Sequence, residues 1–148
     1  MSAKHPIISV TGSSGAGTTS VKRTFDQIFF REKVVAASIE GDAFHRYDRA
    51  AMKLAMAEAE AKGNHHFSHF GAEANLLEEL EATFRSYSET GSGKTRHYVH
   101  DEKEAEIYGS PPGTFTDWEN MPTDADLLFY EGLHGAVKSD TVDVSLYG

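Results

Sequence analysis

The sequence predicts an α/β fold, a mainly parallel sheet with flanking helices, and three observations support it. Two short apolar runs, residues 6–11 and 34–39, are separated by a helical pattern over residues 20–30. A strand–helix–strand unit of this kind has a right-handed crossover that makes its two strands parallel. A glycine-rich segment joins the first strand to the helix, and residues 126–131 form the most hydrophobic strand candidate of the second half.

Two further helices are expected between the second and third strands. Residues 48–62 are rich in alanine and methionine, and the helix that they predict ends at Gly63. Met52 and Met56 are one helical turn apart and are expected in the core. Residues 72–87 predict the second helix. Its core-facing residues are expected to be Leu76, Leu77, Leu80 and Phe84.

The segment from residue 90 to residue 121 is rich in glycine, threonine and aromatic residues. Within it, residues 94–100 alternate loosely and predict one strand of a peripheral hairpin, followed by a turn at residues 111–113. The short run 141–144 is a candidate fourth strand. A complete sheet of this class has about five or more strands. Residues 1–148 are therefore expected to form one domain that is truncated on its C-terminal side, about the N-terminal half of the whole.

Length and composition narrow the functional classes. The 148 residues are enough for one domain with a core, and the net charge of −9 argues against general nucleic-acid binding. There is no leading charged-then-apolar segment and no apolar run of about 18 residues, so neither export nor membrane spanning is indicated. Cysteine is absent, which excludes disulfides and thiolate metal sites and fits a cytoplasmic location.

The glycine-rich segment, residues 12–19, matches the phosphate-loop pattern G-x-x-x-x-G-K-[ST] at both glycines and at the final hydroxyl. Backbone N–H groups and the helix N-terminus can hold the phosphates of ATP, and Thr19 can place its hydroxyl on the accompanying Mg²⁺. Thr18 occupies the lysine position, so positive charge is expected from elsewhere. An ordinary glycine-rich turn is the alternative. The expected nucleotide-binding residues are Gly12, Ser13, Ser14, Gly15, Ala16, Gly17, Thr18, Thr19 and Ser20.

A polar loop follows the second strand and is expected to lie beside the phosphate loop, because the carboxyl ends of parallel strands converge on the ligand crevice. Asp42 is the candidate catalytic base that accepts the proton of an attacking hydroxyl. His45 and Arg49 can bind the hydroxyls and phosphate of a substrate, with Arg46 and Lys53 in reserve. The alternatives are a helix cap or Asx turn for Asp42 and solvated surface charge for the arginines.

The third strand ends in an acid, Glu131, after four apolar residues. An acid that emerges next to a phosphate loop can hold Mg²⁺ directly or through water. A buried strand that simply ends at a polar residue would look the same.

Several of the eight histidines invite a metal site. His65, His66 and His69 lack the i, i+4 pair and third ligand that are typical of zinc, which favours a solvated loop. Tyr98 and His100 become relevant to a site if the hairpin that carries them folds over the crevice.

Four segments together carry a resemblance to a known family. They are residues 8–19 (ISVTGSSGAGTT), 39–46 (IEGDAFHR), 96–101 (RHYVHD) and 127–136 (LLFYEGLHGA). Over residues 4–137 the chain resembles phosphoribulokinases of the bacterial type, which are P-loop kinases. That family also has a hydroxyl residue at the lysine position, so Thr18 follows its pattern.

The resemblance implies ATP-dependent phosphorylation of the C1 hydroxyl of D-ribulose 5-phosphate, which gives ribulose 1,5-bisphosphate for the carbon fixation of the Calvin cycle. It implies that Asp42 is the catalytic base and that Glu131 and Thr19 are the Mg²⁺-side groups. It also implies that four residues contact the sugar phosphate. These are His45, Arg49, Tyr98 and His100.

Regulation and assembly are implied by the same resemblance. Phosphoribulokinases of the bacterial type are homo-oligomers, usually octamers, activated by NADH and inhibited by AMP. Arg31 lies where the family has a residue linked to that regulation.

The chain departs from the family in length. The lysine and arginines of the family's lid would lie beyond Gly148, so the isolated chain is expected to bind ATP weakly and to turn over poorly. A uridine-kinase-like enzyme with a nucleoside acceptor is one alternative, although Arg46 and Arg49 favour a phosphorylated acceptor. A nucleotide-binding regulatory module without catalysis is another.

Overall fold

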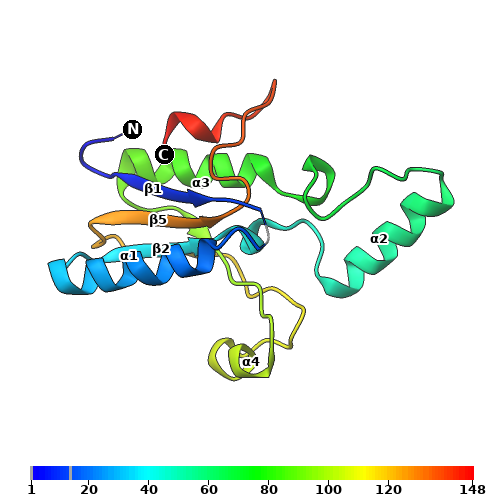
Figure 1. The fold of residues 1–148 in the computed structure, drawn as a ribbon, viewed down its shortest axis with the longest axis horizontal. Coiled ribbons are helices and arrows are strands. Elements are labelled where there is room, and N and C mark those ends of the chain that lie inside the picture. The colour runs from blue at the N-terminus through cyan, green and yellow to red at the C-terminus, as the bar shows by residue number, and fades with distance from the viewer. Residues whose placement is uncertain (1, 14) are drawn as a thin grey trace.

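A three-stranded parallel sheet lies at the centre of the computed structural model, which describes residues 2–13 and 15–148 (Figure 1). The strand order is β1 (Ile7–Thr11), β5 (Leu127–Gly132) and β2 (Ala36–Glu40). All three strands run parallel, and Leu128 is the register partner of both Ile7 and Ala37. The expected parallel α/β sheet is therefore confirmed, with the third strand in the middle.

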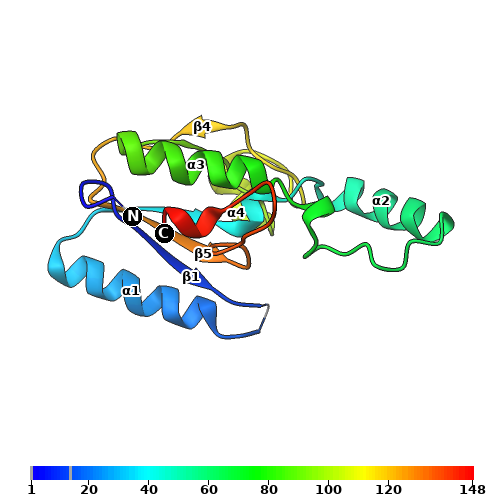
Figure 2. The same cartoon turned by 90° about the horizontal axis from the view of Figure 1, so that it is seen from above.

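Helices cover both faces of this sheet and make three layers (Figure 2). Helix α1 (Thr18–Glu32) packs on one face, where the ring of Phe129 lies 5.2 Å from that of Phe25 between centroids. Helix α3 (Leu77–Thr90) packs on the other face, where Phe84 meets Tyr130 at 5.5 Å. Successive residues of β5 thus point to opposite layers, as the pleat of a strand requires.

The second strand begins two residues later than the apolar run at 34–39 suggests. Lys33 adopts a left-handed conformation, φ 57°, at the end of α1, and Val34 N–H donates to the Phe29 carbonyl at 2.8 Å. The first residues of the run therefore still belong to the turn that ends the helix.

Helix α2 (Arg49–Ala61) begins as expected and projects from the body of the protein (Figure 1). Asp48 caps it by accepting from the Ala51 N–H at 2.8 Å. Met52 is buried, but the prediction that Met56 lies in the core is wrong, because its side chain is 42% exposed. Met52, in the first turn, is the buried residue of this helix.

The peripheral hairpin is shorter than expected. Strand β3 (Lys94–Thr95) pairs antiparallel with β4 (Glu119–Asn120), and Tyr98 forms an isolated bridge with Phe115. A helix that the sequence analysis did not predict, α4 (Glu102–Tyr108), lies inside the hairpin.

The C-terminal run is not a fourth strand. Residues Val144–Leu146 form a 3₁₀ turn, and Val144 is fully buried in the core beside α3. The expected helix at 72–87 is divided into a 3₁₀ turn, Ala72–Ala74, and α3. Leu77, Leu80 and Phe84 are core residues as expected, whereas Leu76 is only partly buried. Within the described residues, no helix is long and apolar enough to cross a membrane.

Candidate active site

The loop between β1 and α1 has the backbone geometry of an anion site. Gly15 and Gly17 have φ of 82° and 88°, which lie in the left-handed region that favours glycine. Gly17 is the N-cap of α1, and neither a side-chain cap nor an acidic residue in the first turn satisfies the helix N-terminus among the described residues. The first N–H groups of α1 are therefore available to an anion. Ser14, one of the expected nucleotide-binding residues, lies outside the described residues.

The loop is closely packed around Gly12. A Cβ at this position would lie 2.9 Å from Thr18 Cγ2 and 3.3 Å from Ala16 Cβ. The Gly12 N–H donates to the Gly132 carbonyl at 3.2 Å, which ties the loop to the end of β5.

The carboxyl ends of β2 and β5 bring acidic residues to the same edge of the sheet. Glu131 is the register partner of Val10 on β1 and of Glu40 on β2. The pKa of Glu40 is raised because burial disfavours its charged form, and the carboxylates of Asp42 and Glu131 add to this effect. Carboxylates crowded in this way are stabilised by a cation.

A cavity of about 690 Å³ lies at this edge, beside the phosphate loop. Nine of the expected site residues line it: Gly12, Ser13, Gly15, Thr18, Thr19, Asp42, His45, His100 and Glu131. The cavity is also lined by nine residues for which the sequence indicates no role in the site, and of these His69 is expected in a solvated loop. They are Lys22, Arg23, Glu40, Gly41, His69, Phe70, Gly132, Leu133 and His134.

Two of these additional residues, Lys22 and Arg23, bring positive charge to the loop that lacks the usual lysine. They lie one turn into α1, and long helical side chains point back toward the helix N-terminus. The position of these two cations one turn after the phosphate loop can be seen in the sequence alone. Lys22 also pairs with Asp26 at 2.8 Å.

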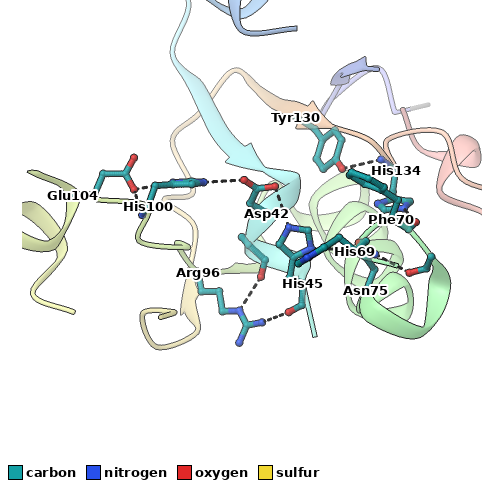
Figure 3. A network of polar contacts seen from close by, with 12 residues as sticks. Asp42, His45, His69, Phe70, Asn75, Arg96, His100, Glu104, Tyr130 and His134 are labelled. Atoms are coloured by element: carbon teal, nitrogen blue, oxygen red, sulfur yellow. Dashed lines mark hydrogen bonds and ion pairs between the residues drawn. The ribbon is translucent and has the colours of Figure 1, made fainter. Parts of the chain in front are cut away.

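The carboxylate of Asp42 lies between two histidine rings (Figure 3). Its Oδ2 is 2.8 Å from His100 Nε2, and its Oδ1 is 3.2 Å from His45 Nε2. The hydrogen bond with His45, together with that from His100, lowers the pKa of Asp42 to about 2 against the opposing effect of burial. Asp42 is therefore ionised at neutral pH. It belongs to the 3₁₀ turn Gly41–Phe44, and its carboxylate caps no helix.

Each histidine has a second partner behind it. His45 Nδ1 lies 3.0 Å from Asn75 Oδ1, and His100 Nδ1 lies 2.9 Å from Glu104 Oε2. Burial lowers the pKa of both rings, but the hydrogen bonds to Asp42 and to these second partners outweigh it and raise both values. The protonated, positively charged form of each ring is thereby favoured.

Arg96 fastens the turn that carries Asp42. Its guanidinium donates to the carbonyls of Ala43 at 2.8 Å and His45 at 2.7 Å. The guanidinium carbon lies 3.6 Å from the centroid of Phe115 and 4.4 Å from that of Trp118. Such stacking is a favourable cation–π contact. Arg96 stands in one of the segments that carry the family resemblance, but nothing in the sequence alone assigns it this contact.

A smaller cavity of about 270 Å³ adjoins the large one and shares His45 and His69 with it. Arg49, Tyr98 and Lys53 line this second cavity. Arg49 donates to the His100 carbonyl at 3.1 Å. Two of the expected substrate residues, Arg49 and Tyr98, thus lie beside the large cavity, and the hairpin does fold over the crevice.

The other expected residues that the structure describes do not line either cavity. Ala16, Gly17 and Ser20 belong to the phosphate loop and the first turn of α1, next to residues that do. Arg31 is at the far end of α1, roughly 20 Å from the loop at about 1.5 Å per residue, and pairs with Glu32 at 2.8 Å. Within the described ranges, no cluster of three or more His, Asp or Glu side chains is arranged to hold a metal ion.

Comparison with known families identifies the fold and its relatives. The sequence profile of the phosphoribulokinase / uridine kinase family matches residues 7–147. The chain belongs to this family. A phosphoribulokinase of Nitrobacter vulgaris is 69% identical over 97% of the chain, and the chromosomal phosphoribulokinase of Cupriavidus necator is 64% identical over 99%. The chain spans about half the length of these curated relatives, 50% in both comparisons.

Solved structures agree with this assignment. The phosphoribulokinase from Rhodobacter spheroides superposes with a TM-score of 0.87 at 56% identity, over 98% of this chain and 49% of that one. A possible uridine kinase from Bacillus stearothermophilus has a TM-score of 0.59 at 15% identity, over 93% of this chain and 66% of that one. The second likeness shows the fold alone. Together they confirm the expected P-loop kinase-type sheet and the expected resemblance.

Proposed function

We propose that the protein containing this chain transfers the γ-phosphoryl group of ATP to the C1 hydroxyl of D-ribulose 5-phosphate. One observation supports this more than any other: the Asp42 carboxylate and the phosphate loop line one cavity of about 690 Å³. A nucleotide on the loop and an acceptor hydroxyl at Asp42 would therefore share the same space. The named phosphoribulokinases at 64–69% identity supply the choice of acceptor.

The phosphates would lie against the N–H groups of the loop and the open N-terminus of α1. Mg²⁺, when bound, would neutralise charge on the phosphates during transfer. Thr19 and Glu131 would hold it, and they fit this part because both offer oxygen ligands of the kind that Mg²⁺ prefers and both line the cavity. Lys22 and Arg23 would add positive charge from α1, in addition to any cation from sequence beyond residue 148.

Asp42 would accept the proton of the C1 hydroxyl as that oxygen attacks. A carboxylate with a pKa of about 2 is a weak base toward a free hydroxyl. It suffices here because phosphoryl transfer passes through a loose transition state, and orientation and charge stabilisation supply most of the rate. His45 and His100 would contact the sugar beside Asp42, while Arg49 and Tyr98 in the adjoining cavity would bind the 5-phosphate.

An acceptor comparison tests this function in the protein as its gene encodes it. Transfer of labelled γ-phosphate to ribulose 5-phosphate, ribulose and uridine is measured side by side. We expect ribulose 5-phosphate to be used at least about 100-fold better than ribulose, because Arg49 would otherwise lack its anionic partner. Preferred use of uridine would support the uridine-kinase-like alternative, and ATP binding without transfer to any acceptor would support a regulatory module.

The Arg49→Ala variant sharpens this test. It is expected to raise KM for ribulose 5-phosphate by about tenfold or more and to leave KM for ATP unchanged, since hydrogen bonds to charged groups contribute roughly 1.5–3 kcal/mol. Lys62→Ala is the matched control, because Lys62 is a cation at the end of the same helix and, among the described residues, pairs with the exposed Glu58 at 2.8 Å. Equal effects of the two variants would exclude a substrate contact by Arg49.

The resemblance also supports proposals about the whole protein. We propose that it is a cytoplasmic homo-oligomer, an octamer when complete, that NADH activates and AMP inhibits. Arg31 is exposed at the end of α1, away from the cavity, so a role there would be regulatory. Light scattering and activity with each nucleotide would test these points.

A further inference from the structure

Asn75 is a buried polar residue next to the candidate active site. It is 2% exposed, and Thr83 is the other buried polar residue among those that the structure describes. Asn75 follows the 3₁₀ turn Ala72–Ala74, and its backbone forms an isolated antiparallel bridge with His45. Asn75 does not line the large cavity, and its side-chain oxygen faces the ring of His45, which does (Figure 3).

The surroundings of Asn75 fix which way its amide points. Nδ2 lies 2.8 Å from the His69 carbonyl and 2.8 Å from the Gly71 carbonyl. Carbonyl oxygens only accept hydrogen bonds, so the NH₂ group must occupy that side. The amide oxygen is left facing His45 Nδ1 at 3.0 Å. Since this oxygen also only accepts, the Nδ1 atom of His45 must carry a hydrogen.

This assignment decides what His45 presents to Asp42. A neutral imidazole carries one hydrogen, and here it is on Nδ1. Nε2, which lies 3.2 Å from Asp42 Oδ1, then has a lone pair toward the carboxylate in the neutral ring and an N–H only in the imidazolium. Without Asn75, the neutral ring could instead place its hydrogen on Nε2 and donate to Asp42 with no charge.

We propose that Asn75 is a positioning residue of the catalytic centre, which holds the Nδ1–H form of His45 so that Nε2, the atom facing Asp42, gains and loses the proton. His45 would then hold a positive charge beside the ionised base. In its neutral form it could accept at Nε2 the proton that Asp42 takes from the substrate hydroxyl. The inference rests on the proposed function only for the role of Asp42.

Within the part of the chain that the structure describes, no other group around His45 competes for the Nδ1 hydrogen. Asp42 faces Nε2, and the Tyr98 ring meets the imidazole edge at 6.3 Å between centroids. Arg96 binds the His45 main-chain carbonyl at 2.7 Å, and the charge of its guanidinium opposes protonation of the ring. Among the described residues, Asn75 is thus the side chain that Nδ1 contacts.

The proton position is measured directly by long-range nitrogen–hydrogen NMR correlations in protein labelled at histidine, which distinguish Nδ1–H from Nε2–H. The sample is the protein as its gene encodes it, without substrate, at a pH where His45 is neutral. We expect the Nδ1–H tautomer in the unaltered protein and a mixture, or Nε2–H, in Asn75→Ala. Nε2–H in the unaltered protein would overturn the proposal, whether or not any variant folds.

Kinetics give a second and independent readout. Asn75→Ala is expected to lower kcat/KM by about tenfold, because residues in one hydrogen-bond network are energetically coupled. In a His45→Ala background the same change should cost no more than about twofold, because the ring through which Asn75 acts is gone. An equal loss in both backgrounds would show a purely structural role and would contradict the proposal.

Thr83→Val is the matched control for lost stability. Thr83 is 4% exposed on α3, and its hydroxyl donates to the Lys94 carbonyl at 2.6 Å, away from the cavity. It should lower stability and leave kcat/KM unchanged. Failure of the unaltered protein to phosphorylate any acceptor would refute the proposed function, while the tautomer would still decide the role of Asn75.

Discussion

Replacing Asp42 with asparagine removes the proposed base and the charge shared by two histidines while keeping the shape of the side chain. The carboxylate interacts with His100 at 2.8 Å and with His45 at 3.2 Å, and neither contact involves the phosphate loop. We therefore expect the loss to fall on turnover rather than on nucleotide binding. Loss of a general base lowers kcat by roughly 10²–10⁴-fold, which corresponds to about 3–5 kcal/mol of barrier.

The assay is transfer of labelled γ-phosphate to ribulose 5-phosphate, with ATP binding measured on the same preparation by calorimetry. Asp126→Asn is the matched control, because Asp126 accepts from the Val35 N–H at 2.7 Å at the start of β5, the opposite end of the sheet, and asparagine keeps that acceptor. Near-normal turnover of Asp42→Asn would refute its role as the base. Loss of ATP binding would refute the separation of the two subsites.

Three further predictions concern the charges around Asp42, the phosphate loop and the hydrophobic core. The pKa of Asp42 is lowered to about 2, and the pKa values of its two histidine partners are raised. The ion pairs therefore stabilise the fold fully from roughly pH 4 to 6.5. This stabilisation is lost as the pH falls through about 2 or rises through the pKa values of the histidines. The unfolding free energy lost in Asp42→Asn, about 1 kcal/mol or less for such exposed pairs, should therefore be larger at pH 5 than at pH 9 in urea titrations, and equal losses would contradict this. Gly17→Ala and Gly63→Ala, at φ of 88° and 77°, should each cost about 1–2 kcal/mol of stability. Only Gly17→Ala should weaken ATP binding, and unchanged binding in this variant would contradict the assignment of the phosphate loop. Phe129→Ala should cost about 3–5 kcal/mol in urea unfolding, since Phe129 is 0% exposed between β5 and α1, and a loss below about 1 kcal/mol would contradict that packing.

The central sheet could be predicted from the sequence because its signals are local. Each strand is a short apolar run bounded by a helix or turn, and the order of the elements implies parallel pairing. Helix α4 could not be predicted in this way, since it is short, four of its seven residues are charged, and none is buried. Its boundaries, a cap by Asp101 and a left-handed Gly109, are recognisable only once the helix is known. The run at 141–144 has a strand-like composition, but Asp143 forms an isolated bridge with Lys138 and Val144 begins a 3₁₀ turn, so the run joins neither sheet.

The candidate site, too, could be predicted only where its signals are local in the sequence. Asp42 and Glu131 could be placed because residues at the carboxyl ends of parallel strands converge. The partners of Asp42 could not, since His100 lies 58 residues away in sequence and reaches it only through the fold of the hairpin. Asn75 carries no sequence signal for its contact, because the 3₁₀ turn before α3 brings it to His45.

The most direct measurement is ³¹P NMR of the product formed from ATP and ribulose 5-phosphate by the protein as its gene encodes it. The proposed chemistry predicts a second phosphomonoester, on the C1 oxygen, in an amount equal to the ADP released, and no such product with Asp42→Asn. ADP released without a new sugar phosphate, or phosphorylation at another oxygen, would contradict the assignment of the cavity as a ribulose 5-phosphate kinase site.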